Sequence, residues 1–339
     1  MFFSHSKSKL GIDIGTSTIK IVQLKKENDQ FLLETYGMVN ASAGVASKID
    51  ADVIAQTAQI LKTLLARANV NTKKVVASLP NNIVFVSVID MPALSDKELK
   101  SAIEWEARRY VPLPLEEVTL SWDVMRESDK ASKIKVLITA VPTTVVENYA
   151  RMFKLAGLEP EALEIEALAL IRSLAGPRQD AFIIVDIGAR NTSLNLVDKG
   201  FLRISRNLPV GGDTITSGIS QSLHVSVARA EQFKMDLGLS GDLQQIPQVM
   251  KSSMESIKNE TSQLIKIYEA SGGTISEIIF AGSGGYLPGL APFFSDLGVK
   301  TSLGDPFKFV GFDERLKSSL SKVSMGLSVA LGLAMRNIE

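Results

Sequence analysis

One sequence pattern occurs twice in the chain, as LGIDIGTSTIKIVQL at 10–24 and as IIVDIGARNTSLNLV at 183–197. Each copy is an apolar run that ends in Asp-Ile-Gly, followed by small polar residues and then by apolar residues at alternate positions. Alternation with a period of two predicts strands, and a glycine between two such runs predicts a tight hairpin. We therefore expect Asp13 and Asp186 at equivalent strand ends in two related α/β halves.

The segment between the two copies is predicted to insert a compact α+β unit into the first half. In chain order we expect a strand at 78–92, a helix at 95–110, strands at 120–125 and 134–141, and a helix at 144–156. Ser95 and Glu98 have the spacing of a capping box at the start of the first helix. Gly157 follows the second helix as its stop.

The remaining segments predict further helices around the two hairpins. We expect an amphipathic helix at 50–68, a strand at 201–205, helices at 213–224, 226–236 and 248–270, and a strand followed by a glycine-rich turn at 277–290.

Composition excludes several classes of protein. The 339 residues include no Cys and two His, so disulfides, thiolate metal sites, a Cys nucleophile and a multi-His metal site are all excluded. The 37 basic residues balance 37 acidic ones, which argues against bulk binding to nucleic acid. The start MFFSHSKSKL lacks the apolar core of a signal peptide, and MGLSVALGLAM at 325–335 is shorter than the ~18–20 residues that span a bilayer. We therefore expect a soluble protein of a reducing compartment, without direct membrane insertion.

Three turns of small residues follow predicted buried strands, at 13–18, 186–192 and 281–285. Backbone amides in such turns form concave anion sites, and hydroxyls such as that of Ser17 add donors. Asp13 and Asp186, one from each half, can together hold the waters of a hydrated Mg²⁺. This combination predicts a nucleoside triphosphate site between the halves.

Two other nucleotide motifs are excluded. No G-x-x-x-x-G-K-[ST] string occurs, and Leu287 stands where G-x-G-x-x-G needs its third glycine.

The order of these motifs resembles the actin-like ATPase superfamily over essentially the whole chain. The matching elements are DIGTSTIK, the inserted unit, DIGARNT, PVGGDTIT, AEQFK and AGSGGYLPGL. Within the inserted unit, VIDMPALSDKELKSAIEWEARRYVPLPLEEV at 88–118 is closely similar to the PilM family of type IV pilus assembly proteins, relatives of the division protein FtsA. The resemblance implies an α/β, actin-like (ribonuclease H-like) two-domain fold, with a nucleotide cleft between the halves and an inserted 1C-type subdomain.

The resemblance also divides the chain into subdomains. Residues 1–83 and 157–178, with a C-terminal helix at 323–338, would form subdomain 1A, and 84–156 would form subdomain 1C. Residues 179–213 and 272–322 would form subdomain 2A, and 214–271 would form subdomain 2B.

The resemblance assigns ATP or ADP and Mg²⁺ as cofactors and gives roles to individual residues. Asp13 and Asp186 would lie near Mg²⁺, which they would hold through water. The phosphates would contact Gly15, Thr16, Ser17, Lys20, Gly188, Asn191, Thr192, Gly211, Gly212 and Asp213. The adenosine would contact Glu231, Lys234, Gly282, Gly284, Gly285 and Leu287, although without the resemblance Glu231 and Lys234 would favour the interpretation of a solvated helix pair.

One departure from the superfamily bears on catalysis. Many hydrolysing relatives have Gly-Gly-Thr after the second Asp-x-Gly, whereas this chain has Ala189, Arg190 and Asn191. Glu166, with Glu164 in reserve, is the candidate to position the attacking water, and a surface carboxylate at a helix start is an equal alternative for both. We therefore expect slow or partner-dependent hydrolysis at most.

The function implied by the resemblance is that of a cytoplasmic, ATP-binding scaffold, peripheral to the inner membrane through a protein partner. It would bind the N-terminal cytoplasmic peptide of a PilN-like membrane protein between subdomains 1A and 1C, together with other pilus platform proteins and possible copies of itself. Trp105 is the candidate groove residue, with core burial as the alternative. An FtsA-like filament-forming ATPase and a small-molecule kinase of the same superfold are the alternative functions.

Overall fold

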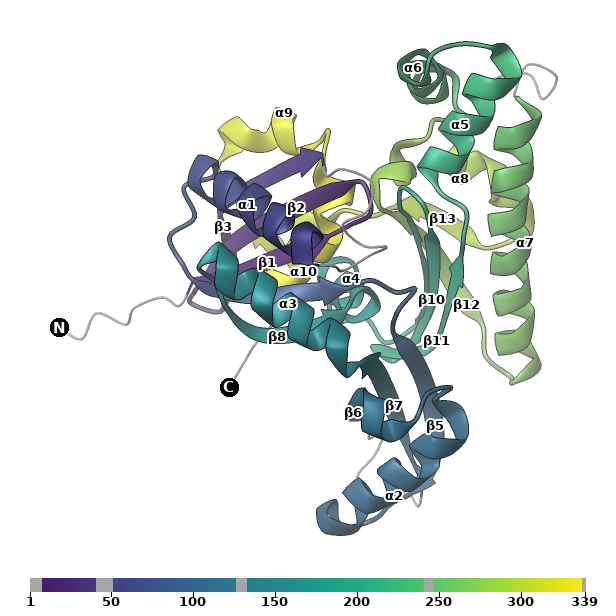
Figure 1. The fold of residues 1–339 in the computed structure, drawn as a ribbon. Coiled ribbons are helices and arrows are strands. Elements are labelled where there is room, and N and C mark those ends of the chain that lie inside the picture. Colours follow the sequence, from purple (N-terminus) through teal and green to yellow (C-terminus); the bar gives the residue numbers. More distant parts are fainter. Residues whose placement is uncertain (1–7, 41–50, 126–132, 241–246, 337–339) are drawn as a thin grey trace.

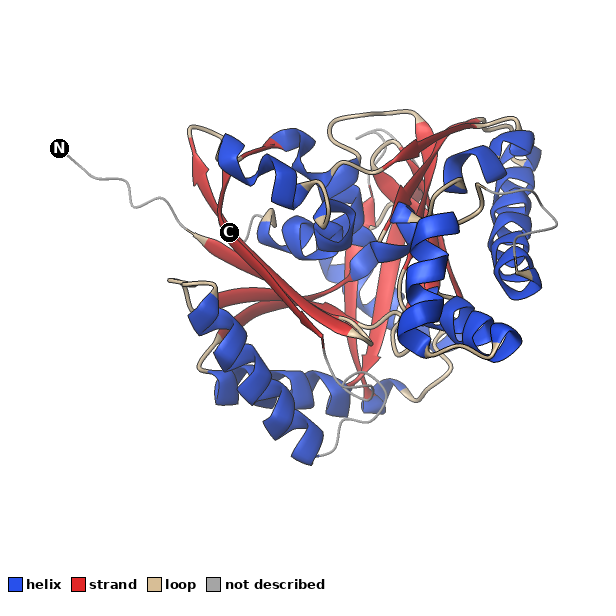
Figure 2. Ribbon diagram, turned by 90° about the horizontal axis from the view of Figure 1, so that it is seen from above, coloured by secondary structure: helices blue, strands red, loops and turns tan. Residues whose placement is uncertain are grey.

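The computed structural model describes residues 8–40, 51–125, 133–240 and 247–336. Within them the chain forms two α/β halves, each built on its own sheet, and a smaller three-stranded sheet that projects from the first half (Figure 1). Seen from above, the strands of the two halves run between layers of helices (Figure 2). The predicted actin-like arrangement of two α/β halves with an inserted unit is confirmed.

The first half has a six-stranded sheet of order β14-β3-β2-β1-β4-β8. Its strands are β1 (Lys9–Ile14), β2 (Thr18–Glu27), β3 (Gln30–Asn40), β4 (Lys74–Leu79), β8 (Glu159–Ile165) and β14 (Val310–Gly311). The helices α1 (Ala51–Arg67) and α3 (Thr143–Ala156) cover one face, and α4 (Glu166–Leu174) and α10 (Ser328–Ala334) cover the other. Leu10, Ile12 and Ile14 of β1 all point toward α1 and α3, which explains the strict alternation in the sequence.

The second half has a five-stranded sheet of order β11-β10-β9-β12-β13. Its strands are β9 (Ala181–Ile187), β10 (Thr192–Asp198), β11 (Phe201–Leu208), β12 (Ile275–Ala281) and β13 (Lys300–Leu303). The helices of this half are α5 (Gly212–Leu223), α6 (Val227–Leu237), α7 (Gln248–Ala270) and the short α8 (Leu290–Phe293). Side chains from these helices form one apolar core with the sheet.

The two copies of the repeated pattern have the same pairing. In each half the first strand pairs antiparallel with the next strand of the hairpin and parallel with a third strand, β4 or β12. The turns also match, because the amide of Gly15 donates to the carbonyl of Thr18 at 3.0 Å and that of Gly188 donates to that of Asn191 at 3.0 Å. The predicted pair of related hairpins is therefore confirmed.

The inserted unit is an antiparallel sheet of order β5-β7-β6 covered by one helix. Its elements are β5 (Phe85–Pro92), α2 (Asp96–Tyr110), β6 (Val118–Met125) and β7 (Lys133–Pro142). The backbone amide of Ser95 donates to Oε2 of Glu98 at 3.3 Å, as the predicted capping box requires. The strand expected at 78–92 is instead two strands in different sheets, because the chain turns at Pro80 after β4.

Two of the expected subdomain ranges do not match the cores in which their residues pack. Helix α3, which we expected inside the inserted unit at 84–156, buries Tyr149 and Phe153 in the core under the first sheet. Part of the segment at 272–322 also belongs to the first half, because β14 pairs with β3 and Phe307 packs in its core, next to the short α9 (Lys317–Leu320). Helix α10 of the expected terminal helix packs on the first half, and residues 337 and 338 lie outside the described residues.

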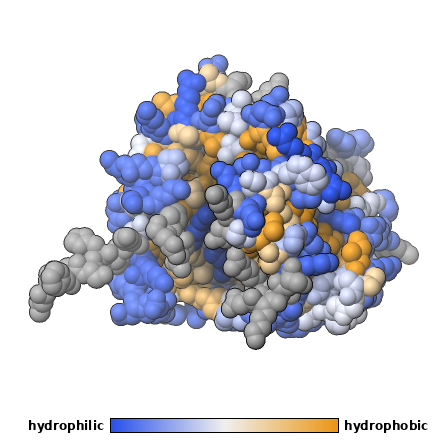
Figure 3. All heavy atoms as spheres, turned by 90° about the horizontal axis from the view of Figure 1, so that it is seen from below, coloured by the Kyte–Doolittle hydropathy of each residue, from blue (hydrophilic) through white to orange (hydrophobic). Residues whose placement is uncertain are grey.

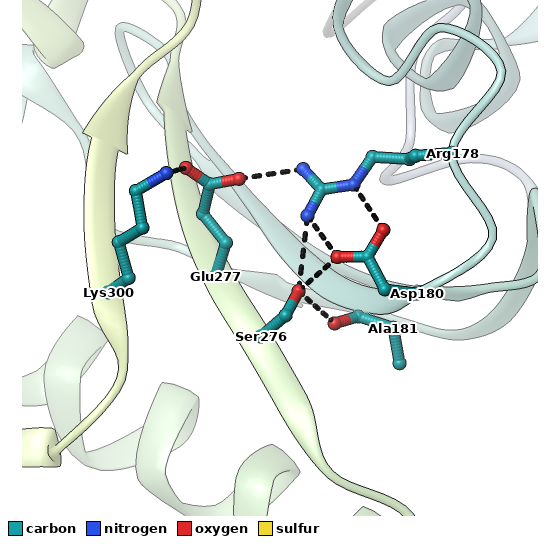
Figure 4. A network of polar contacts seen from close by, with 6 residues as sticks. All are labelled: Arg178, Asp180, Ala181, Ser276, Glu277 and Lys300. Atoms are coloured by element: carbon teal, nitrogen blue, oxygen red, sulfur yellow. Dashed lines mark hydrogen bonds and ion pairs between the residues drawn. The ribbon is translucent and has the colours of Figure 1, made fainter.

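A cluster of polar contacts links the start of the second half to its sheet (Figure 4). The guanidinium of Arg178 donates to Asp180 at 2.9 Å and to Glu277 at 2.7 Å. Glu277 also accepts from Lys300, at 2.9 Å, so the cluster joins the strands β12 and β13 to the connection between the halves.

Hydrophobic residues on the face seen from below lie in separate patches between hydrophilic ones (Figure 3). None of the helices in the described part of the chain is both long and apolar enough to cross a membrane.

Candidate functional site

A cavity of about 500 Å³ lies between the two halves. It is lined by both Asp-Ile-Gly turns, by the start of α4, by α5 and α6 and by the glycine-rich turn after β12. The carboxyl ends of β1, β4, β9 and β12 meet here because β1 pairs parallel with β4 and β9 pairs parallel with β12. This edge is where open α/β sheets bind ligands.

The first turn carries a carboxylate whose two oxygens are both bound. Oδ2 of Asp13 accepts from Nζ of Lys20 at 3.1 Å, and Oδ1 accepts from the hydroxyl of Ser78 on β4 at 2.9 Å. Burial by itself would lower the pKa of Lys20, but the negative charges of Asp13, Asp186 and Glu166 raise it. Lys20 is therefore a fixed cation at the floor of the cavity.

The second turn carries a carboxylate with no such partners. No group in the described part of the chain hydrogen-bonds the carboxylate of Asp186, although it lines the same cavity. Burial raises its pKa to about 6, with the charge of Lys20 acting against the rise and that of Asp13 adding to it. Asp186 is thus a partly buried carboxylate of the cavity wall without a hydrogen-bonded cation.

The glycine-rich turn lies directly against this carboxylate. Gly282 has a φ of 76°, in the left-handed region that favours glycine. A Cβ at this position would lie 2.5 Å from Oδ1 of Asp186, and one at Gly284 would lie 2.3 Å from a side-chain carbon of Ile187. The small residues here therefore let the turn approach the second hairpin closely.

Helix α4 contributes Glu166 from its first residue. Its Oε2 accepts from the side-chain amide of Asn81 at 2.6 Å. Burial, together with the charges of Asp13 and Asp186, raises the pKa of Glu166, against the opposing effect of Lys20. Glu164, the reserve candidate, does not line the cavity and is paired with Arg172 and Arg336.

The opposite wall of the cavity comes from α5 and α6. Nζ of Lys234 donates to Oε2 of Glu231 at 2.6 Å, to the hydroxyl of Thr216 at 2.9 Å and to the carbonyl of Gly212 at 3.2 Å. Because Lys234 is buried, the alternative of a solvated helix pair does not apply to it. Its bonds tie α6 to the first turn of α5.

Two hydrogen bonds cross the cavity from one half to the other. The hydroxyl of Ser17 donates to Oδ2 of Asp213 at 2.9 Å, and the side-chain amide of Asn207 donates to the carbonyl of Asn81 at 3.5 Å. The second is at the limit of hydrogen-bond length. Beside the glycine-rich turn, the backbone amide of Met325 also donates to the hydroxyl of Tyr286 at 2.9 Å, so the halves are joined at both the mouth and this wall of the cavity.

Most of the predicted nucleotide-site residues lie together in the cavity wall. These are Asp13, Gly15, Thr16, Ser17, Lys20, Glu166, Asp186, Gly188, Asn191, Gly212, Asp213, Glu231, Lys234, Gly282, Gly284 and Leu287.

Three predicted residues do not line the cavity but pack directly behind the residues that do. The hydroxyl of Thr192 donates to the carbonyl of Val210 at 2.7 Å. A Cβ at Gly211 would lie 2.5 Å from the carbonyl oxygen of Ala189, and one at Gly285 would lie 3.0 Å from the sulfur of Met325.

Sequence analysis missed Ser78 and Asn81, which both bond an acidic residue of the site. Both residues lie at or just after the carboxyl end of β4, which pairs parallel with β1. The sequence alone does not show this pairing, so it could not place them at the site. Three methionines of the wall, Met235, Met254 and Met325, had no signal of their own.

The donor set fits a magnesium nucleotide. The described residues contain no group of three or more His, Cys, Asp or Glu that could hold a bare metal ion. Mg²⁺ usually keeps several waters and takes one or two carboxylates, which the cavity offers as Asp186 without a partner and Asp13 nearby. The turn amides, Lys20 and the hydroxyl of Ser17 supply donors for phosphate oxygens.

The chain is similar to proteins of one family over nearly its full length. A model of the family "Type IV pilus assembly protein PilM" matches residues 11–338. The solved PilM-PilN type IV pilus biogenesis complex contains a chain that superposes with a TM-score of 0.86 and 27% identity, with 98% of each chain covered.

Two more distant similarities concern the wider superfamily. Cell division protein FtsA of Streptococcus pneumoniae serotype 2 is 24% identical over 297 residues, which are 80% of this chain and 63% of FtsA, so the chain spans less than two thirds of that relative. The structure of MreB5 of Spiroplasma citri bound to AMPPNP has a TM-score of 0.53 at 13% identity, with 96% of this chain and 94% of MreB5 covered. The latter shows a shared fold.

Proposed function

The chain belongs to the type IV pilus assembly protein PilM family, and we propose that it is a nucleotide-binding scaffold of the pilus inner-membrane assembly platform. Its partner would be the N-terminal cytoplasmic peptide of a PilN-like membrane protein, so that it lies at the inner membrane through that partner. The observation that carries the proposal is the similarity, over 98% of both chains, to a chain of the PilM-PilN complex.

In this proposal ATP binds in the cavity between the halves. Its phosphates would contact the amides of the turns at 13–18 and 186–192 and the ammonium of Lys20. Mg²⁺, when bound, would neutralise phosphate charge, and Asp13 and Asp186 would hold it through water. The adenosine would lie between the glycine-rich turn after β12 and the wall of Glu231 and Lys234.

Nucleotide would then bias the closure of the two halves. Two side-chain hydrogen bonds cross the cavity mouth, so phosphates that contact both turns would add contacts that a more open form lacks. A ligand shifts such an equilibrium by its differential affinity for the two forms, and the coupling to a second ligand is reciprocal. ATP would therefore change the affinity for the partner peptide, and the peptide would change the affinity for ATP.

Binding is better supported than turnover. Glu166 lies in the cavity, but its carboxylate already accepts a hydrogen bond from Asn81, and burial with the charges of Asp13 and Asp186 raises its pKa. Hydrolysis needs a group that orients the attacking water. We therefore propose slow or partner-dependent ATP hydrolysis at most.

We propose that the partner site includes the inserted unit. Trp105 on α2 is 63% exposed, so the alternative of core burial does not apply to it. Exposed aromatic side chains often anchor partners. An extended peptide that docks between this unit and the first half would bury this ring at low cost in conformational freedom.

A labelled N-terminal peptide of a PilN-like protein tests the proposal when it is titrated without nucleotide, with Mg-ADP and with Mg-ATP. We expect binding that depends on the nucleotide and a loss of about tenfold or more in Trp105→Ala, as for an interface anchor. Val227→Ala is the matched control, because Val227 is also 63% exposed but lies on α6 of the other half. Absence of peptide binding in every nucleotide state would contradict the proposed partner.

A further inference from the structure

A second groove lies on the first half, between the edge strand β3 and helix α1. This β3–α1 groove is formed by residues 36–39 of β3, by residues between 56 and 67 of α1 and by Ala68 directly after the helix, and its volume is about 620 Å³. It contains none of the residues that line the cavity between the halves. The chain enters the inserted unit after β4. In the sheet order, β3 lies three strands away from β4, so the groove is separated from that entry point.

The outer edge of β3 is open along most of its length. Strand β14 pairs with β3 only at Phe31 and Leu32. Among the described residues, no other strand pairs with the outer edge of 33–40, while the inner edge is fully paired with β2. An open edge presents a row of unpaired amides and carbonyls that another extended chain can complete.

The groove follows this open edge. Gly37 and Val39 face α1, since a Cβ at Gly37 would lie 3.0 Å from a methyl carbon of Leu64 and Val39 packs on the core under α1. Tyr36 packs on the core of the opposite face, and Met38 is 39% exposed. Because residues from both faces line the groove, it must run along the backbone edge between them.

Helix α1 forms the other wall with a stripe at helical spacing. Gln56, Ile60, Thr63 and Arg67 line the groove along this stripe, with Ile60 partly buried at its centre. A strand edge beside a helix is the arrangement in which peptides bind by strand addition, with backbone bonds for affinity and side-chain pockets for specificity.

Arg67 gives the groove a charge preference. Arg67 is exposed at the end of α1, and no carboxylate of the described residues forms an ion pair with it. We propose that the β3–α1 groove binds an extended segment of a partner protein by strand addition. This segment has apolar side chains at alternate positions and a carboxylate that pairs with Arg67.

Synthetic peptides as long as the open part of β3 test this proposal. The probes alternate valine and threonine and carry aspartate at one end or the other, with lysine versions as the matched set. Binding is followed by fluorescence anisotropy, and hydrogen exchange locates the contact. We expect an aspartate probe to bind and to protect amides within 33–40 of β3.

Charge reversal provides the specific control. Arg67→Glu should weaken the aspartate probe by about fivefold or more, near the upper range for an exposed ion pair, and should favour the lysine probe instead. Lys62→Glu is the matched change, because Lys62 is exposed on α1 but does not line the groove. It should leave binding unchanged. Met38→Lys should weaken the lysine probes by adding a like charge to the groove lining.

Several results would overturn the proposal. One is the absence of binding by any probe, and another is equal binding of aspartate and lysine probes in the wild type. Exchange protection outside 33–40 would place the contact elsewhere. Displacement of the probe by the PilN-like peptide would show that the groove is not a separate partner site. Self-association in sedimentation that Arg67→Glu abolishes would assign the groove to a second copy of the chain.

Discussion

The two Asp-Ile-Gly turns have the same backbone but differ in how their carboxylates are bound. Asp13 is bonded to Lys20 and Ser78, whereas Asp186 has no hydrogen-bond partner among the described residues. A repeated hairpin thus places two carboxylates at one cavity, and side chains outside the repeat decide their roles. The first is part of the folded framework, and the second is left for a ligand.

The largest expected effect is on stability and concerns Asp13, the carboxylate that is bonded within the fold. Asp13→Ala leaves the partly buried Lys20 without its partner, which should reduce the free energy of unfolding by up to about 3–5 kcal/mol, the range for a fully buried pair, while the protein still folds. Asp186→Ala removes no bond from the described residues and should reduce it little or increase it. Urea unfolding without nucleotide compares the two variants, and equal losses would contradict the assigned difference.

The next largest effect is on ATP binding and concerns Asp186, the carboxylate without a partner. Asp186→Asn should weaken ATP binding in the presence of Mg²⁺ by about 10–100-fold, as expected for a group that holds a metal through its outer contacts. Asp13→Ala should also lose Mg²⁺-dependent binding. Isothermal titration with and without Mg²⁺ measures both, with Asp52→Asn on the exposed start of α1 as the control. Wild-type binding in both variants would exclude the site.

The pH dependence of stability should show the unpartnered carboxylate directly. Burial raises the pKa of Asp186 from its ordinary value of 3.8 to about 6, so between these values the folded form binds a proton more readily than the unfolded form. Asp186 therefore contributes a stability that falls as the pH rises through this window. The difference in melting temperature between the wild type and Asp186→Asn isolates this contribution. A difference that does not change with pH would contradict the raised pKa.

The smallest expected effect is on stability and concerns a buried hydroxyl beneath the first turn. The hydroxyl of Tyr149 on α3 is buried and has no partner within the described residues, and its burial raises its pKa. Removing a buried, unsatisfied polar group should be neutral or stabilising, by up to about 1 kcal/mol. Tyr149→Phe therefore should not lower the free energy of unfolding in urea. A clear loss of stability would show that the hydroxyl is bonded after all.

The sequence predicted those features that depend on local pattern. The repeated hairpins, the cavity residues of the turns and the helices of the second half all follow from alternation, glycine positions and helical spacing. The packing partner of α3 did not follow, because an amphipathic stripe shows which face is buried but not which sheet covers it. Likewise Ser78 and Asn81 enter the site through the parallel pairing of β1 with β4, a contact between distant segments.

The most direct test of the proposed nucleotide site is a retention measurement. The purified protein is mixed with Mg-ATP, free nucleotide is removed, and the nucleotide that stays bound is identified over time. The proposal predicts retained ATP, or ADP that accumulates slowly, and a clear loss of retention in Asp186→Asn. No retained nucleotide, together with no binding in direct titration, would contradict it and leave a scaffold whose actin-like fold serves only to hold partners.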